Sequence, residues 1–158
     1  MREPTLALTL PDEVQTQRLG ELLAGALPDL SQRPLVIHLQ GDLGAGKTTL
    51  VRGFARRLGI TETIRSPTYT LVETHETADL CVVHVDLYRV NDEQEVDALA
   101  LSEYLMPRHV LLIEWPQRGG GFTPPADLSL QLEYRGAGRQ ALLAGQSGPG
   151  RALVDALR

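Results

Sequence analysis

Residues 41–48 read GDLGAGKT, a run with three glycines, one lysine and one threonine. Glycines let the backbone approach phosphate oxygens, and the free amide N–H groups at the start of a helix attract an anion. A plain glycine-rich turn would need neither Lys47 nor Thr48 at these offsets, whereas a P-loop uses the lysine on the outer phosphates and the hydroxyl on Mg²⁺. We therefore predict a P-loop that binds nucleotide through Gly41, Asp42, Leu43, Gly44, Ala45, Gly46, Lys47, Thr48 and Thr49.

Two carboxylates follow apolar runs elsewhere in the chain. Glu114 comes directly after VLLI, and Asp86 comes directly after CVVHV. A P-loop enzyme needs a carboxylate at the end of a neighbouring strand to hold Mg²⁺ or its water ligands. We assign Glu114 and Thr48 to the metal, and Asp86 and Lys47 to catalysis, with Asp86 positioning or activating the attacking water. A strand-end cap is the alternative role for each carboxylate.

Two further positions have two interpretations each. Thr68 lies in SPT, residues 66–68, where P-loop proteins often place a loop that senses the terminal phosphate, although a simple turn fits as well. Trp115 directly follows Glu114 and is predicted either to approach the nucleotide or to pack in the core.

Basic residues gather after the P-loop, at positions 52, 56, 57 and 65. We interpret them as a solvated helix face that complements the helix dipole, with a contact surface for an anionic partner such as tRNA as the alternative. His38 and His84 lie inside apolar runs without zinc-spaced partners and are interpreted as structural.

The elements that position these residues follow from the hydrophobic pattern. Helical spacing predicts helices over 12–27 and 47–58 and a helical region over 91–105. Residues 61–76 are expected to be irregular and 118–125 to be a linker. Short apolar or alternating runs predict strands over 5–10, 35–40, 80–85, 109–115 and 128–134, with a partner strand from 139 that completes a C-terminal β-hairpin. This order predicts an α/β fold with the sheet covered on both faces.

Composition limits the class of protein. With 158 residues, of which 42% are apolar and 22% charged, the chain is expected to fold as one globular domain over residues 1–158. A net charge of -5 without a long Lys/Arg run argues against a large basic surface for bare nucleic acid. Cys81 is the only cysteine, which favours a reducing, cytoplasmic setting. No signal peptide or membrane span is found, so we expect a soluble protein.

Four blocks of the sequence together resemble the bacterial TsaE family, the ATPase of tRNA threonylcarbamoyladenosine biosynthesis. They are GDLGAGKTT at 41–49, SPTYTLVE at 66–73, HVDLYR at 84–89 and IEWPQR at 113–118, in the family's order. The P-loop alone is shared with many unrelated proteins, but the four blocks together are specific. The resemblance covers roughly residues 10–145, whereas GQSGPG and RALVDALR match no family motif.

This resemblance implies a single-domain P-loop NTPase of three layers, with a mixed, mostly parallel central sheet flanked by helices. It implies ATP and ADP as ligands, Mg²⁺ as cofactor, and weak hydrolysis without partners. The partners are the TsaB and TsaD proteins, with tRNA reached indirectly through their complex, and hydrolysis supports multiple turnover of TsaD. By the same resemblance Lys47 and Thr48 hold phosphate and Mg²⁺, Glu114 is the second metal-side ligand, Asp86 is needed for hydrolysis, and Glu13 and Arg139 line the base or ribose.

Two other classes of P-loop protein remain as alternatives. A small-metabolite kinase would place an arginine-bearing lid over the phosphates, for which RGGGF at 118–122 is the one obvious segment. A nucleotide-switched binding module would depend on the bound state rather than on hydrolysis. The guanine-reading pattern [NT]-K-x-D is absent because Lys47 is the only lysine, so a GTP switch is disfavoured.

Overall fold

A computed structural model of the chain describes residues 5–158. Within them the strands form one seven-stranded sheet in the order β1-β7-β6-β2-β5-β4-β3. The four strands in the middle of the sheet, β6, β2, β5 and β4, run parallel, while β1, β7 and β3 pair antiparallel. The strands are β1 Thr5–Leu10, β2 Leu35–Gln40, β3 Val72–Glu76, β4 Cys81–Asp86, β5 His109–Glu114, β6 Leu128–Arg135 and β7 Gly138–Gly145.

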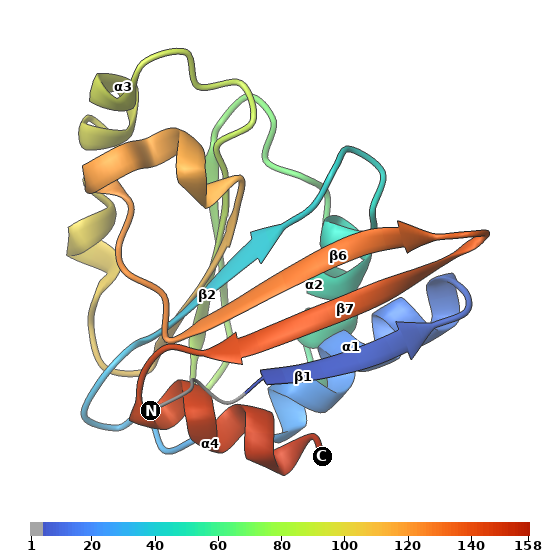
Figure 1. Cartoon of the computed structure of the whole chain (residues 1–158). Helices are drawn as coiled ribbons and strands as arrows, with labels where there is room; N and C mark the ends of the chain where they lie inside the picture. The colour runs from blue at the N-terminus through green and yellow to red at the C-terminus, as the bar shows by residue number, and fades with distance from the viewer. Residues whose placement is uncertain (1–4) are drawn as a thin grey trace.

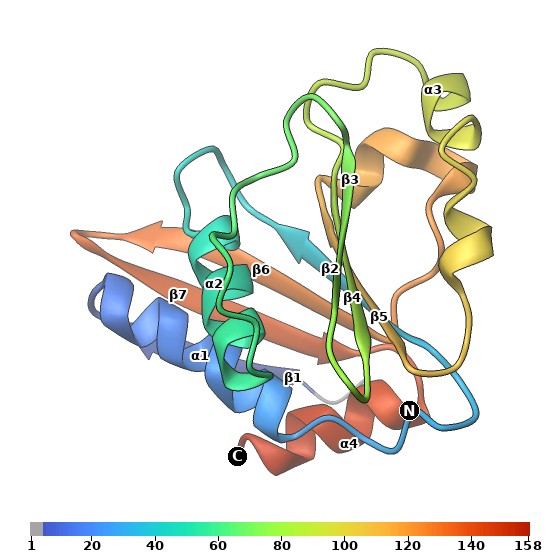
Figure 2. The same cartoon turned by 180° about the vertical axis from the view of Figure 1, so that it is seen from behind.

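Helices cover both faces of this sheet, as predicted. On one face α1 (Glu13–Gly25) and α2 (Lys47–Arg57) lie side by side, and α4 (Gly148–Ala156) packs against β7 (Figures 1 and 2). The other face of β4 and β5 carries the short helices α3 (Glu93–Asp97), η1 (Leu101–Tyr104) and η2 (Pro116–Phe122). The chain therefore has the three-layer α/β architecture, with a mixed sheet and a β6–β7 hairpin, that the sequence indicates.

The helices α1 and α2 approach each other closely at two glycines. A Cβ atom on Gly53 would lie 1.9 Å from the carbonyl oxygen of Gln17, and one on Gly20 would lie 2.0 Å from that of Leu50. Both distances are shorter than any side chain tolerates. Since α2 begins at the P-loop, this packing holds the start of α1 next to the loop.

Residues 61–76 were predicted to be irregular, and this is wrong for the last five of them. Val72–Glu76 forms β3, which pairs antiparallel with β4 at the edge of the sheet. In this strand only His75 is buried, so the segment lacks the apolar run that reveals a central strand. The edge position explains why the sequence pattern missed it.

The predicted helical region 91–105 is interrupted. Helix α3 ends at Asp97, Ala100 adopts a left-handed φ of 51°, and η1 follows. Val96 and Leu101 are both buried in the core beneath. Residues five apart on one α-helix point about 140° away from each other, so the chain must turn to bury both.

The segment 118–125 is not a free linker. Most of it belongs to η2, which packs against α3. A Cβ atom on Gly119 would lie 2.0 Å from Thr123 Oγ1 and 3.2 Å from Val96 Cγ1. The glycines therefore permit close packing, and the prediction of a linker was wrong.

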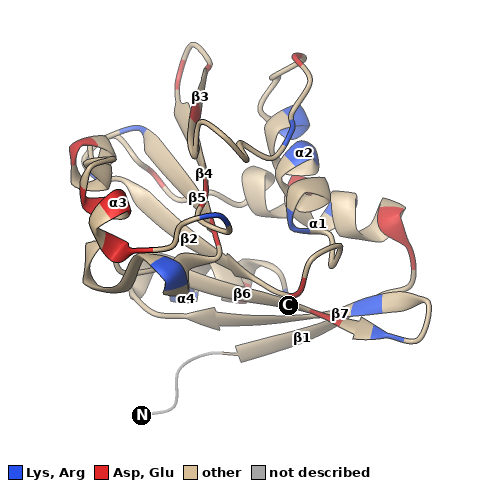
Figure 3. Ribbon diagram, turned by 90° about the horizontal axis from the view of Figure 1, so that it is seen from above, with Lys and Arg blue, Asp and Glu red and all other residues tan. Residues whose placement is uncertain are grey.

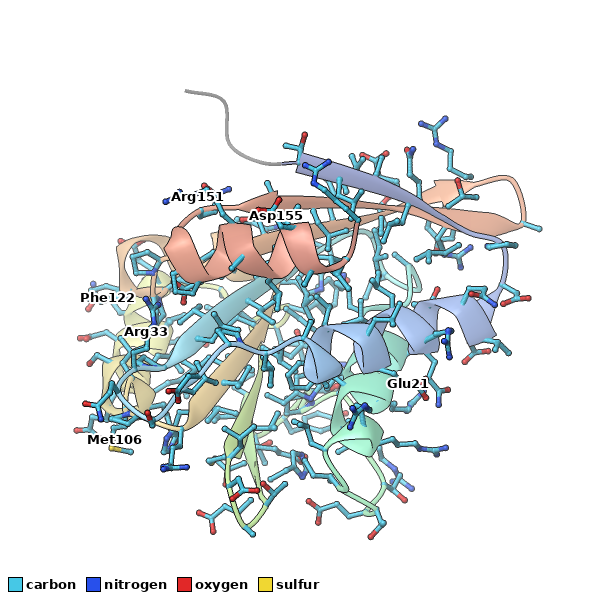
Figure 4. All side chains as sticks on the ribbon, turned by 90° about the horizontal axis from the view of Figure 1, so that it is seen from below. Glu21, Arg33, Met106, Phe122, Arg151 and Asp155 are labelled. Atoms are coloured by element: carbon cyan, nitrogen blue, oxygen red, sulfur yellow. The ribbon has the colours of Figure 1, made fainter. Side chains whose placement is uncertain are left out.

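The C-terminal residues, which match no motif, form α4. Ser147 caps this helix by accepting a hydrogen bond from the Gly150 amide at 3.2 Å. Leu153 and Val154 are buried in the core, whereas Arg151 and Asp155 face solvent (Figure 4). No helix within residues 5–158 is long and apolar enough to cross a membrane.

Candidate nucleotide-binding site

The glycine-rich loop lies between β2 and α2, as the P-loop pattern requires. Gly41, Gly44 and Gly46 have φ angles of 146°, 79° and 110°, a range that favours glycine. A Cβ atom on Gly41 would lie 2.6 Å from the carbonyl oxygen of Leu132, so this position also excludes a side chain by contact. Gly46 precedes α2 without a side-chain cap, which leaves the first amide groups of the helix available to an anion.

The β6–β7 hairpin holds the loop from outside. Tyr134 Oη donates to the carbonyl of Leu43 at 2.8 Å, while Arg139 donates through Nη2 to Gly44 and through Nε to Ala45, both at 3.1 Å. The Arg139 guanidinium also stacks 4.1 Å from the centre of the Tyr134 ring. These contacts tie the shape of the loop to the hairpin, a role for Tyr134 that the sequence did not reveal.

Lys47 is the first residue of α2 and is 5% exposed. Its ammonium group donates to the carbonyl of Gly41 and lies 4.1 Å from the centre of the Trp115 ring. Burial lowers the pKa of Lys47, while the nearby carboxylates of Glu114, Asp86 and Asp42 oppose this shift. The positive charge of Lys47 therefore lies at the loop, surrounded by carbonyl oxygens, carboxylates and the face of an aromatic ring. A phosphate bound at the loop would lie close to this charge.

The side chains of Thr48 and Glu114 form a hydrogen bond beside the P-loop. Thr48 Oγ1 donates to Glu114 Oε2 at 3.3 Å, and Glu114 lies directly opposite Asp86 on the neighbouring parallel strands. The residues described contain no group of three or more His, Cys, Asp or Glu placed to hold a metal by themselves. Mg²⁺ needs no such cage, since it is usually bound through one or two protein oxygens together with water and substrate phosphates.

Asp86 is 7% exposed and has both oxygens engaged. Oδ1 accepts the backbone N–H of Tyr88 at 2.9 Å, and Oδ2 accepts the hydroxyl of Ser66. Oδ1 therefore has the strand-end capping role that the sequence analysis gave as the alternative for Asp86. The other oxygen faces the SPT loop, in which the Thr68 amide donates to the Ser66 carbonyl at 2.8 Å.

Trp115 reaches the P-loop and also packs against the core on the α3 side of the sheet. Its ring centre lies 5.0 Å from that of Tyr88, and the guanidinium of Arg118 stacks on both rings. Trp115 has a φ of 57°, an uncommon conformation for a residue other than glycine. The interpretation of Trp115 as a core residue is therefore confirmed, and its approach to the nucleotide stays a prediction.

Two cavities flank the loop and share Gly44, Gly46 and Thr49. The phosphate-side cavity, about 550 Å³, contains the predicted residues Leu43, Lys47, Thr48, Thr68, Asp86, Glu114 and Trp115. The helix-side cavity, about 320 Å³, contains Glu13, Ala45 and Arg139, together with Asp12, Thr16, Ala137 and Gly138, which the sequence did not indicate. Gly41 and Asp42 lie at the base of the loop between β2 and α2.

The predicted basic face divides into two parts. Arg56 and Arg57 are exposed at the end of α2, as expected for a solvated face (Figure 3). Arg52, by contrast, donates to the carbonyl of Ile64 at 2.9 Å and lines the phosphate-side cavity. Figure 3 also shows basic residues near the tip of the β6–β7 hairpin and acidic residues on α3.

The two histidines differ. His38 Nε2 lies 2.8 Å from the carbonyl oxygen of Pro124, a structural contact of the kind expected. His84 Nε2 lies 2.5 Å from Glu114 Oε2 and so contacts a predicted site residue. In the sequence, the feature that could have indicated this contact is the position of His84 two residues before Asp86, which places both side chains on the same face of the strand.

Comparison with known proteins gives one consistent family. The family model described as threonylcarbamoyl adenosine biosynthesis protein TsaE matches residues 10–141. The chain is 36% identical over 153 residues to the tRNA threonylcarbamoyladenosine biosynthesis protein TsaE of Haemophilus influenzae, covering 96% of this chain and 97% of that protein. The protein of the same name from Synechocystis is 42% identical over 122 residues, which cover 75% of this chain and 74% of the relative.

A solved structure has the same fold. The crystal structure of YdiB from Bacillus subtilis superposes with a TM-score of 0.81 and 26% sequence identity. The superposition covers 99% of this chain and 96% of that chain. It therefore includes all elements that carry the two cavities.

Proposed function

The chain belongs to the TsaE family of tRNA threonylcarbamoyladenosine biosynthesis proteins, and on this premise we propose that it binds and hydrolyses ATP for that modification. The observation that carries the proposal is the convergence of Lys47, Thr48, Asp86 and Glu114 on the phosphate-side cavity. The whole chain, residues 1–158, acts in this proposal as one P-loop ATPase domain.

The groups in this cavity fit ATP and Mg²⁺. The loop glycines leave room for phosphate oxygens, and Lys47 supplies a buried positive charge beside them. Thr48 and Glu114 offer the hydroxyl and carboxylate oxygens that would hold Mg²⁺. When bound, Mg²⁺ neutralises phosphate charge and fixes the phosphates in position.

Asp86 and Lys47 have separate tasks in hydrolysis. Asp86 orients the attacking water and takes up its proton, and its carboxylate is held in place by the Tyr88 amide. Lys47 stabilises the negative charge on the outer phosphates. The Ser66 hydroxyl donates to Oδ2 of Asp86, so the SPT loop also holds this carboxylate in place.

The helix-side cavity is the proposed place for the base or ribose. Glu13 lies exposed at the start of α1 and lines this cavity together with Arg139. The Arg139 guanidinium already binds loop carbonyls, so its contribution to the nucleotide includes holding the loop. Thr68, on the phosphate side, is proposed to sense the terminal phosphate.

The proposed partners are TsaB and TsaD, in the cytoplasm, with tRNA bound to their complex rather than to this chain alone. We propose that ATP hydrolysis supports repeated turnover of that complex in modifying the adenosine next to the anticodon. The net charge of -5 supports an indirect route to tRNA, because direct binding to nucleic acid requires clustered positive charge.

The test is an ATP hydrolysis assay of the purified protein, alone and with TsaB, TsaD and tRNA. We expect slow hydrolysis alone and a faster rate when all partners are present. An Asp86→Asn variant, tested with the same partners, serves as the control for contaminating ATPases. A rate that does not change on adding the partners would remove the proposal.

A small-metabolite kinase finds less support. Its expected lid, RGGGF, lies entirely within η2, which packs against α3. Arg118 from this segment stacks on Tyr88 and Trp115. A free lid over the phosphates would need this segment to leave that packing. A screen of metabolites for phosphorylated product separates the two functions, since only a kinase makes one.

A further inference from the structure

His84 is a fully buried histidine that the proposed hydrolysis does not use. It lies on β4 with 0% exposure, on the same face as Asp86. Its neighbour on that face, Val82, belongs to the core beneath α1 and α2, so the imidazole points to the P-loop side of the sheet. His38, on β2, points to the other side with Val36.

The ring of His84 contacts one oxygen of Glu114. His84 Nε2 lies 2.5 Å from Glu114 Oε2, the same oxygen that accepts the Thr48 hydroxyl at 3.3 Å. In the sheet register His84 lies opposite Leu112. This pair is two residues before the Asp86–Glu114 pair on each strand, and its side chains lie on the same face. The imidazole thus supports the carboxylate from the protein interior, while Thr48 contacts it from the P-loop helix.

Packing alone does not explain a histidine at this position. Nδ1 of His84 is buried and has no hydrogen-bond partner among the residues described. A buried polar atom without a partner destabilises the fold, and an apolar side chain here would avoid that penalty. The one interaction that an apolar residue could not make here is the contact to Glu114. Because a carboxylate oxygen accepts, the ring nitrogen Nε2 must donate and therefore has the proton.

We propose that His84 is a positioning residue that orients the Glu114 carboxylate for Mg²⁺ bound together with the nucleotide. This inference rests on the proposed function, in which Glu114 is a metal ligand. Groups that hold a metal ligand by hydrogen bonds typically change metal affinity about 10- to 100-fold when they are removed. His84 touches neither nucleotide nor metal in this scheme and acts only through Glu114.

Two amide substitutions separate this role from a structural one. In His84→Gln the side-chain amide reaches the position of Nε2 and can still donate to Glu114. In His84→Asn the amide reaches only the position of Nδ1, so the contact to Glu114 is lost. Both variants replace the ring by a polar amide, and a loss caused by packing would therefore affect both.

The experiment measures ADP binding by calorimetry, first in EDTA and then over a series of Mg²⁺ concentrations. For His84→Asn we expect unchanged ADP affinity in EDTA and a rise of about 10-fold or more in the Mg²⁺ concentration for half-maximal binding. His84→Gln should recover most of the difference, and His38→Gln should behave as the unsubstituted protein. Equal Mg²⁺ dependence of His84→Asn and the unsubstituted protein would overturn the inference, as would equal losses in the Asn and Gln variants.

Glu114→Gln distinguishes this inference from the proposed function. If Glu114→Gln removes the Mg²⁺ dependence and His84→Asn does not, only the role of His84 fails. If Glu114→Gln itself leaves the Mg²⁺ dependence unchanged, the metal assignment in the proposed function fails, and the role of His84 fails with it.

Discussion

The two cavities beside the P-loop differ in how deeply their charged side chains are buried. The phosphate-side cavity contains the charged side chains Lys47, Asp86 and Glu114, none of which is more than 7% exposed. The helix-side cavity also contains charged side chains, but these lie nearer the surface: Asp12 and Glu13 are exposed, and Arg139 is half-buried. Charges interact more strongly when water is excluded. On the proposed function, we therefore expect the chemistry in the first cavity and only weaker binding contacts in the second.

The strongest test of this contrast is Asp86→Asn. Asparagine can still accept the Tyr88 amide, but it cannot take up a proton from water, so we expect hydrolysis to fall by about 10² or more with ATP affinity retained. Calorimetry and a hydrolysis assay on the same preparation measure both. If the variant loses ATP binding and folds poorly, Asp86 is a structural cap and the contrast weakens.

Lys47→Ala is expected to have the next largest effect. Removing the buried cation from the loop should lower nucleotide affinity roughly 10- to 100-fold, since hydrogen bonds to charged groups contribute about 1.5–3 kcal/mol. Arg56→Ala, at an exposed position on the same helix, is the matched control. Unchanged affinity of Lys47→Ala in calorimetry would remove the P-loop assignment.

Gly53→Ala tests how the helix-side cavity is held. The added methyl group would overlap the Gln17 carbonyl at 1.9 Å and push α1 away from α2, at a cost of about 1–3 kcal/mol in the free energy of unfolding. Denaturant unfolding measures this loss. Gly59→Ala provides a comparison in open space, although its φ of 87° carries a strain of its own. A variant as stable as the unsubstituted protein would show that α1 can shift freely.

Glu13→Ala should have the smallest effect. An exposed side chain that contributes one hydrogen bond accounts for about 0.5–1.5 kcal/mol, so we expect ADP affinity to fall no more than about tenfold and hydrolysis by bound enzyme to stay unchanged. Glu21→Ala, on the same helix but outside the cavity lining (Figure 4), is the control. A loss of hydrolysis comparable to that of Asp86→Asn would erase the distinction between the cavities.

The sequence predicted the parts of this site that depend on local pattern. The P-loop, the strand ends at Asp86 and Glu114, and the hairpin all follow from short motifs or from alternation. It did not predict the contacts of Ser66, His84 and Tyr134, because their partners lie 20, 30 and 91 residues away in the chain. Pairing across the sheet and between loops is set by tertiary packing, which a single sequence pattern does not contain.

The same reason explains the errors in the fold. β3 has a polar exposed face and pairs only with β4, so its pattern resembles that of a loop. The glycines at 119–121 looked like a linker, yet Gly119 is small because Leu87, Val96 and Thr123 surround it. In both cases the neighbour in space, rather than the neighbour in sequence, determines the structure.

The most direct measurement is a crystal structure with a non-hydrolysable ATP analogue and Mg²⁺. We expect the triphosphate at Lys47 in the phosphate-side cavity, Mg²⁺ held by Thr48 and Glu114, and the base or ribose in the helix-side cavity beside Glu13. A nucleotide bound with its phosphates away from Lys47, or a metal ion without Thr48 and Glu114 around it, would contradict the division of work between the two cavities.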